Sequence, residues 1–274
     1  MIVFYALGGG WGHFTRVHSF IQQAGFDVPK KVIVANPKAA TYFDTDELIV
    51  VPELAQKDAV ALRSFLLEIS RSNDIEKWYI DTFPVGILGE LEVGIFQGAE
   101  VNLLARRLIW ENYLPMIQAP IQFTNVYRFE SLEAEYQEYL DKHSRAITSV
   151  DFSASSFAEE NRHPLGQSEQ PIWLVVHSSS EEELALLIDH AFDLAFIEKK
   201  RPRIIVLSDF EASVPKGSHL LLGENPRDWY GLAERIFTAA GFNTWYELAH
   251  YREKHICLPF KRKYDDQFWR SRQG

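Results

Sequence analysis

The sequence has little that would tie it to an oxidising compartment or to a membrane. Its 274 residues include a single cysteine, Cys257, so no disulfide can form within the chain. The apolar start MIVFYALGGG breaks into glycines after seven residues and has no basic leader, which argues against a signal peptide or a membrane span. We therefore expect a cytoplasmic protein whose contact with membranes is at most peripheral.

The chain also has fewer basic than acidic residues. The chain has 28 Lys and Arg against 38 Asp and Glu, a net charge of −10, which argues against non-specific binding to nucleic acid or to an anionic membrane. One local exception is KRKYDDQFWRSR at 261–272, with five basic and two acidic residues. A patch of this size suits a phosphate or diphosphate better than a long polyanion. The composition, 46% hydrophobic and 24% charged, is that of a soluble globular protein.

Short apolar runs rich in Val and Ile alternate with longer segments of helical period. This alternation predicts an α/β fold with largely parallel sheets. The predicted strands are 2–7, 31–36, 47–52, 77–81, 101–109 and 121–127, followed by 171–177, 203–208, 219–223, 233–240 and 255–260. The predicted helices are 13–25, 57–72, 131–142 and 181–200.

A polar segment with two prolines and a glycine, ENRHPLGQSEQP at 160–171, separates the two series and is interpreted as a linker. The prediction is therefore two Rossmann-like domains, residues 1–160 and 172–274. We expect them to face each other across a cleft, with ligands at the carboxyl ends of the strands.

The first strand ends in a glycine-rich loop, ALGGGWGHF. Gly8, Gly9 and Gly10 let the backbone turn tightly and approach a ligand. The pattern is neither GxGxxG nor a phosphate-binding P-loop, because no Gly-Lys-Ser/Thr follows. His13, at the start of the next helix, could deprotonate a hydroxyl near neutral pH. The alternative is that His13 caps the helix or packs against Trp11.

Three other polar groups are candidates for a functional site, and each also has a structural interpretation. Asp44 and Asp46 form a DxD pair, but the pair precedes a strand, so we interpret it as a solvated loop and expect no metal site. Asp81 and Thr82 stand at the carboxyl end of a strand, where α/β clefts form, although Asp81 could equally cap the next helix. In the second series, HSSSEEE places Ser and Glu at the spacing of a capping box.

The segment 238–269 combines several ligand-binding features. Gly241 follows a strand, Asn243 and Thr244 begin a helix, and Glu247 lies one turn further on. Helix-start amides can hold a diphosphate, and a carboxylate at Glu247 can accept both hydroxyls of a ribose. Taken singly, Asn243 could be a cap and Glu247 part of a solvated helix face.

A loop after the last strand carries three further candidates. Arg262 could meet phosphate charge, while Asp266 and Gln267 could grip sugar hydroxyls. Asp266 could instead pair with Arg270. The combination of all these residues in one segment favours a nucleotide-sugar site.

Two of these motifs resemble a known family. TAAGFNTWYELAHYREKHICLPF followed by DDQ resembles the donor-binding segment of GT-B glycosyltransferases, in the branch of the peptidoglycan N-acetylglucosaminyltransferase and the galactolipid synthases. GGGWGHFTR resembles the glycine-rich N-terminal loop of that branch, and IDTFPVGILGEL resembles related transferases. Together the motifs frame nearly the whole chain, and the middle matches in architecture only.

The resemblance implies transfer of a sugar from a nucleoside diphosphate donor, UDP in the first instance, to an acceptor hydroxyl of a glycan, lipid or small molecule. It implies no bound metal and no cofactor beyond the donor. His13 would be the general base or position the acceptor. The implied donor contacts are Glu247 with the ribose, Gly241, Asn243 and Thr244 with the diphosphate, Arg262 with the departing diphosphate, and Asp266 and Gln267 with the sugar.

Two departures from the family pattern leave alternatives open. The chain ends at Gly274, so the C-terminal domain is expected to be shortened, and the loop HSSSEEE is not glycine-rich. A catalytically silent nucleotide-sugar binding protein is therefore an alternative, as is a UDP-sugar 2-epimerase of the same fold. The epimerase would need further acid and base carboxylates. A lipid-facing transferase would need an exposed apolar or basic patch.

Overall fold

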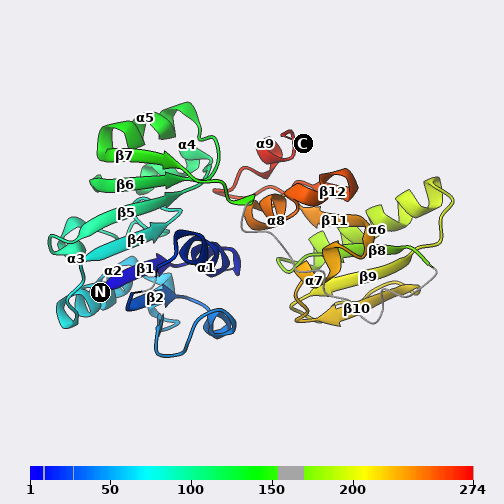
Figure 1. Cartoon of the computed structure of the whole chain (residues 1–274), viewed down its shortest axis with the longest axis horizontal. Coiled ribbons are helices and arrows are strands. Elements are labelled where there is room, and N and C mark those ends of the chain that lie inside the picture. Colours follow the sequence, from blue (N-terminus) through cyan, green and yellow to red (C-terminus); the bar gives the residue numbers. More distant parts are fainter. Residues whose placement is uncertain (9, 27, 154–169, 274) are drawn as a thin grey trace. The chain divides into compact units, whose positions relative to one another are not determined.

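The computed structural model describes residues 1–8, 10–26, 28–153 and 170–273 and divides the chain into two compact units (Figure 1). The first unit comprises Met1–Phe152 and Lys263–Asp265, and the second Ser153–Arg262 and Asp266–Gly274. A short stretch near the C-terminus thus belongs to the first unit. All but the last two residues of the predicted linker 160–171 lie outside the described residues.

The first unit is built on a seven-stranded sheet in which every neighbouring pair is parallel. The strand order is β3-β2-β1-β4-β5-β6-β7. The chain therefore runs outward from β1 to β3, then returns to the other side of β1 at β4. The strands are β1 (Ile2–Ala6), β2 (Lys30–Val34), β3 (Leu48–Val50), β4 (Lys77–Asp81), β5 (Glu100–Ala105), β6 (Phe123–Arg128) and β7 (Ser144–Ser149).

The helices of the first unit begin and end at residues suited to those positions. The Asp58 side chain accepts hydrogen bonds from the first backbone N–H groups of α2 (Ala59–Ser72). Gly25, at φ 65°, ends α1 (Gly12–Ala24) in the left-handed conformation that glycine adopts without strain. The other helices are α3 (Val93–Phe96), α4 (Trp110–Tyr113), α5 (Ala134–His143) and the 3₁₀ turns η1 (Pro37–Thr41), η2 (Ala55–Lys57) and η3 (Leu114–Met116).

Alternation along the strands gives this sheet two buried faces. On one face Phe4 stacks on Tyr79 at 4.8 Å, and Phe20 of α1 packs against Tyr79 and Tyr127. On the other face, residues such as Tyr5 join a core cluster with α2 and α3. Burial on both faces explains why these strands are near-continuous apolar runs in the sequence.

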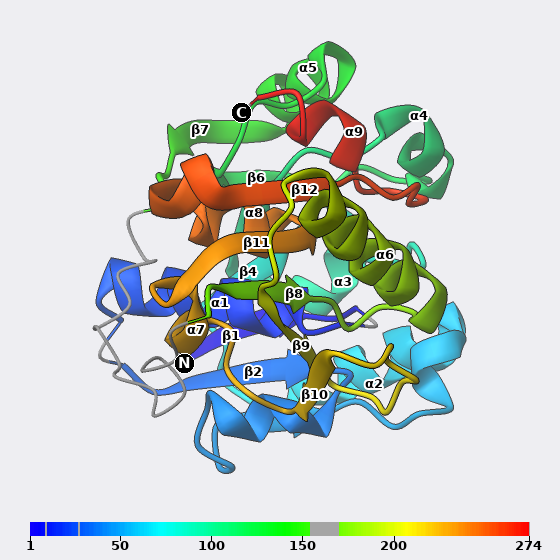
Figure 2. The same cartoon turned by 90° about the vertical axis from the view of Figure 1, so that its right-hand side faces the viewer.

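The second unit repeats the plan with five parallel strands in the order β10-β9-β8-β11-β12 (Figure 2). Its strands are β8 (Ile172–Val176), β9 (Arg203–Ser208), β10 (Ser218–Leu222), β11 (Ala233–Ala239) and β12 (His255–Leu258). The long helix α6 (Glu181–Ile197) packs its Leu184, Leu187 and Ile188 on one sheet face. Residues of α7 (Arg227–Tyr230) and η6 (Ala249–Lys254) pack on the other face, and α8 (Phe242–Glu247) and α9 (Gln267–Arg270) complete the unit.

The α/β fold with two Rossmann-like parallel sheets is confirmed, as are all eleven predicted strands and the four predicted helices. Of the predicted capping box, the N-cap half is present, because Ser180 Oγ accepts from Glu183 N at 3.2 Å, whereas the Glu183 carboxylate contacts Arg262. Strand β7 was not predicted. Its SRAITS sequence is polar and only partly buried, and it forms a sheet edge by pairing with β6. No helix in the described part of the chain is long and apolar enough to cross a membrane.

Candidate active site

The first candidate site lies at the carboxyl edge of the seven-stranded sheet. The chain leaves β1 for one side of the sheet and later returns to the other side at β4, so the neighbouring ends of β1 and β4 mark the topological switch point. In open α/β sheets this is where crevices for ligands form. The glycine-rich loop follows β1, and Asp81 is the last residue of β4.

His13 and Asp81 form a hydrogen-bonded pair at this edge. His13 Nδ1 lies 2.6 Å from Asp81 Oδ2, although 68 residues separate them in the chain. The Asp81 side chain is fully buried, and that of His13 is 13% exposed. An ionised carboxylate can only accept, so the proton of the neutral imidazole is on Nδ1. Nε2 is then the basic nitrogen.

Arg16, one turn along α1, fixes the carboxylate. Its Nε donates to Asp81 Oδ1 at 2.7 Å, and its NH2 donates to Asp81 Oδ2 at 2.5 Å and to Thr82 Oγ1 at 2.7 Å. This is the bidentate arrangement that suits guanidinium and carboxylate. Both side chains are almost completely buried. These contacts hold the side chains of His13, Arg16 and Asp81 in one fixed arrangement.

Thr82 has an unusual backbone at the end of β4. Its φ is 69°, and Phe83 N donates to Asp81 O at 2.8 Å across a three-residue turn. A positive φ in a β-branched residue costs on the order of 1–3 kcal/mol and is typical of functional sites. In this conformation Thr82 Oγ1 donates to Asp81 Oδ2 at 3.1 Å while accepting from Arg16.

Gly8 makes room for the histidine ring. A Cβ at Gly8 would lie 2.0 Å from His13 Cδ2 and 2.1 Å from His13 Nε2, far inside van der Waals contact. A Cβ at Gly10 would meet no atom within 4 Å. Gly8 is thus required by the position of His13, whereas Gly10 leaves open space. Gly9, predicted to approach a ligand, lies outside the described residues.

The pKa values of the pair are shifted so that His13 is neutral and Asp81 ionised at neutral pH. Burial lowers the pKa of His13, and this outweighs the opposing effect of the Asp81 carboxylate. The nearby charges of Arg16 and Arg106 lower the pKa of His13 further, because they disfavour the imidazolium. Burial raises the pKa of Asp81, but Arg16 and His13 oppose it and bring the value down to about 2.

Aromatic residues form one wall around His13. The Phe83 ring lies 5.7 Å from the His13 ring and also packs against Tyr113 and Tyr264. Tyr264 comes from the C-terminal stretch of the first unit, and its carbonyl accepts from Ile109 N at 2.9 Å. His13 therefore packs against Phe83 rather than against Trp11, which contacts Phe14 and Tyr42.

The first aspartate of the DDQ motif contributes to the same neighbourhood. Asp265 Oδ1 accepts from Arg106 NH1, and both side chains are largely buried. Arg106 follows β5 directly, and its charge helps to lower the pKa of His13. Sequence reasoning missed this ion pair because 159 residues separate its members.

The GILGEL segment has a structural role. The Glu90 carboxylate is fully buried, accepts from the Tyr5 hydroxyl and from Leu88 N, and has its pKa raised by burial. Gly86, at φ 83°, has no room for a Cβ, which would lie 2.1 Å from Glu90 Oε1. This glycine and glutamate hold the loop after β4 in place.

In the second unit, Gly241 and α8 follow β11 at the corresponding switch point between β8 and β11. Gly241 is the N-cap of α8, and a Cβ there would meet nothing within 4 Å. Asn243 and Thr244 lie in the first turn, as predicted. Glu247 ends the helix and is held by Arg227, whose NH2 lies 2.7 Å from its Oε1.

Arg262 pairs with a carboxylate in this structure. Its two terminal nitrogens contact the two carboxylate oxygens of Glu183, with NH2 2.5 Å from Oε2. His177, directly after β8, lies 2.9 Å from the same oxygen through its Nε2. The three side chains form a cluster at the carboxyl edge of the second sheet. A diphosphate at Arg262 would have to compete with Glu183.

The other two predicted sugar contacts have local hydrogen bonds. Asp266 Oδ1 accepts from Trp269 N at 3.0 Å and caps α9. Gln267 is 4% exposed, and its side-chain oxygen accepts from Phe260 N at 3.0 Å. Arg270, the alternative partner of Asp266, donates to Ala240 O at 2.7 Å. Among the described residues, no group of three or more His, Cys, Asp or Glu side chains could hold a metal ion.

Comparison with solved structures identifies the class of fold. A UDP-GlcNAc 2-epimerase from Neisseria meningitidis, bound to UDP-GlcNAc, superposes with a TM-score of 0.65 at 10% identity over 96% of this chain and 84% of its own. The glycosyltransferase SnogD from Streptomyces nogalater gives 0.56 at 10% identity over 100% and 84%. The spinosyn rhamnosyltransferase SpnG, complexed with thymidine diphosphate, gives 0.57 at 10% identity over 99% and 83%.

The chain therefore has the GT-B type of fold, with two Rossmann-like domains. No protein-family model and no curated protein matches the sequence. At these identities the likeness extends to the fold alone. The branch of GT-B proteins that the motifs resemble is not singled out, because these structures include both epimerases and glycosyltransferases.

Proposed function

We propose that this protein is a glycosyltransferase that moves a sugar from a nucleoside diphosphate donor to an acceptor hydroxyl, with His13 as the general base. The observation that carries the proposal is the His13–Asp81–Arg16 arrangement at the switch point of the first sheet. It supplies a neutral imidazole whose proton is held on Nδ1, so that Nε2 can take a proton from a hydroxyl.

In the proposed reaction the acceptor hydroxyl gives its proton to His13 Nε2 while its oxygen bonds to the anomeric carbon of the donor sugar. The bond from that carbon to the diphosphate breaks, and the diphosphate leaves with the electron pair. The imidazolium formed is stabilised by Asp81, as in other carboxylate–histidine pairs. Arg16 keeps Asp81 ionised and correctly oriented throughout.

Residues of the second unit are proposed to bind the donor, with UDP as the expected nucleoside diphosphate. Glu247 would bind the ribose and Gly241 would allow close approach of the diphosphate. Arg262 would balance the charge of the leaving diphosphate after exchanging its contact with Glu183. The roles of Asn243 and Thr244 beside the diphosphate, and of Asp266 and Gln267 beside the sugar, belong to the same proposal. Support comes from related folds crystallised with UDP-GlcNAc or thymidine diphosphate.

A UDP-sugar 2-epimerase is the second candidate, because several of the similar structures are UDP-GlcNAc 2-epimerases. Inversion at carbon 2 needs groups that remove and return a proton. Of the two carboxylates that the structure brings to the His13 neighbourhood, Asp81 is ionised and bound to Arg16, and Asp265 is paired with Arg106. Neither is suited to exchange a proton with substrate, which favours transfer.

The test is to incubate the protein with UDP- and dTDP-sugars, with and without a panel of glycan, lipid and small-molecule acceptors, and to measure nucleoside diphosphate release and glycosylated product. We expect acceptor-dependent release that falls about 10²–10⁴-fold in His13→Gln, with His143→Gln as a matched control in the same unit. Deuterium at carbon 2 of UDP-GlcNAc recovered from D₂O, without transfer, would instead identify an epimerase.

A further inference from the structure

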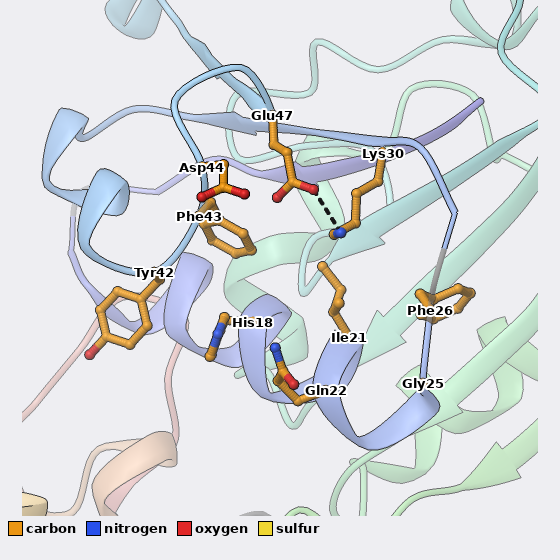
Figure 3. Close-up of a pocket in the computed structure, with 10 residues that line it drawn as sticks. All are labelled: His18, Ile21, Gln22, Gly25, Phe26, Lys30, Tyr42, Phe43, Asp44 and Glu47. Carbon is orange, nitrogen blue, oxygen red and sulfur yellow. Dashed lines mark ion pairs between the residues drawn. The ribbon is translucent and has the colours of Figure 1, made fainter.

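The first unit has a cavity that lies apart from His13. It has a volume of about 410 Å³, within the range of small-molecule sites. Figure 3 shows α1 on one side, the segment that leads into β3 on the other, and Lys30 beside Glu47. The cavity is lined by His18, Ile21, Gln22, Gly25, Phe26, Lys30, Tyr42, Phe43, Asp44 and Glu47.

This cavity is at the opposite end of the strands from the candidate active site. Lys30 opens β2, and Glu47 directly precedes β3. Both strands are parallel to β1 and β4, so these residues mark the amino edge of the sheet, whereas Asp81 marks the carboxyl edge. His13 and His18, five residues apart, also project from different faces of α1. Occupation of this cavity is therefore distinct from chemistry at His13.

Aromatic and aliphatic side chains give the cavity fixed walls. The His18 ring contacts the Tyr42 ring at 5.2 Å and the Phe43 ring at 5.5 Å, both in edge-on geometry. Phe43 and Ile21 are buried, at 6% and 4% exposure. Ring and aliphatic surfaces of this kind can pack against the C–H face of a ligand.

Polar groups lie at defined positions in the same walls. Glu47 N donates to Asp44 O at 3.0 Å, so the two carboxylates stand at the two ends of one turn. Lys30 Nζ lies 2.7 Å from Glu47 Oε1, and both side chains are mostly buried. Figure 3 shows the Gln22 amide on the α1 side, facing this group. The wall thus combines carboxylates that accept hydrogen bonds, an ammonium group that donates them and an amide that can donate and accept.

We infer that this cavity is a binding site for a neutral carbohydrate of about the size of a monosaccharide or disaccharide. One ammonium against two carboxylates disfavours an anionic ligand, and Lys30 occupies one oxygen of Glu47. Alternating donors and acceptors match a polyhydroxylated ring, and the ring surfaces match its C–H face. The site would hold a glycan independently of whether the protein transfers sugars, so its test is separate from that of the proposed function.

The experiment is saturation-transfer NMR followed by titration of the full chain with glucose, lactose, cellobiose and N,N′-diacetylchitobiose. Glucuronate and choline serve as anionic and cationic probes. We expect at least one neutral sugar to bind. Asp44→Asn should weaken that binding by about tenfold, the loss of one hydrogen bond to a charged group.

Asp46→Asn is the matched control, because it makes the same change in the same turn at an exposed residue that does not line the cavity. Thermal unfolding of both variants shows whether the fold is kept, and Gln22→Ala repeats the test from the α1 side. The inference is overturned if no neutral sugar binds, if Asp46→Asn weakens binding as much as Asp44→Asn, or if glucuronate or choline binds in preference to every neutral sugar.

Discussion

His13 Nδ1 lies 2.6 Å from Asp81 Oδ2, and the two residues come from the first helix and the fourth strand of one sheet. The contact decides which nitrogen of His13 is basic. It also couples the histidine to Arg16, because both bind the same carboxylate. The expected behaviour of the site follows from this arrangement.

Replacement of Gly8 by alanine should abolish or strongly reduce activity. The added Cβ would lie about 2 Å from the His13 ring, so the ring must leave its place beside Asp81. Gly10→Ala is the control, because the loop has open space there. We expect a loss of the order of that in His13→Gln for Gly8→Ala, about 10²–10⁴-fold, and little change for Gly10→Ala. Equal effects of the two substitutions on turnover would contradict the steric argument.

The pH dependence of activity should be displaced to low pH. Burial lowers the pKa of His13 from its ordinary value of 6.5, so the neutral, basic form persists below pH 6.5. The rate should therefore stay level as pH falls from 8 through 6.5, and should fall only at lower pH. The titration of the His13 ring, followed by NMR in wild type and His13→Gln, checks the assignment. A midpoint at or above 6.5 would show that Asp81 outweighs burial.

Asp81→Asn should destabilise the first unit by about 3–5 kcal/mol, because it leaves the buried Arg16 without its carboxylate. The same contact has a pH signature. The pKa of Asp81 is about 2 in the folded protein against an ordinary value near 3.8, so its contribution is complete above the ordinary value. That stability should be lost as pH falls from about 4 towards 2. Urea unfolding at several pH values measures both effects, and a variant as stable as wild type would refute the assignment.

Glu183→Gln should strengthen binding of a nucleoside diphosphate. In the structure Glu183 neutralises Arg262 through both carboxylate oxygens, so removing its charge releases the guanidinium for phosphate. Glu182→Gln is a matched control, because it removes the same charge from the neighbouring, exposed residue of α6. We expect several-fold tighter UDP binding in Glu183→Gln only. Weaker binding in this variant would indicate that the ion pair holds Arg262 in its binding position.

The sequence predicted the fold well because the strands and long helices carry their own periodic signals. Strand β7 was not predicted because SRAITS has no alternation of apolar residues. Its strand conformation depends on pairing with β6. His13 was identified as a candidate from its place after a glycine loop. Its partner Asp81 was recognised only as the end of a strand, since no local pattern links residues 68 positions apart.

In the second unit, the sequence located the motif residues but not the side chains that they contact. These motif residues lie on α8 and on the loop after β12 as predicted, except that Gln267 begins helix α9, and their contacts depend on distant residues. Arg227 holds Glu247, and Glu183 holds Arg262. Asp265 was passed over in favour of Asp266, although it is Asp265 that reaches the buried Arg106. Such pairings are set by the topology and have no signature in spacing.

Calorimetric titration with UDP tests the central claim, a nucleotide-sugar site in the second unit, most directly. It compares wild type, Glu247→Gln and the control Glu253→Gln, which changes an exposed residue of the same segment, each with and without EDTA. The account predicts binding in the micromolar range that is lost in Glu247→Gln, kept in Glu253→Gln and unaffected by EDTA. Absence of binding to UDP and to every other nucleoside diphosphate would contradict it and leave the fold as a scaffold for another purpose.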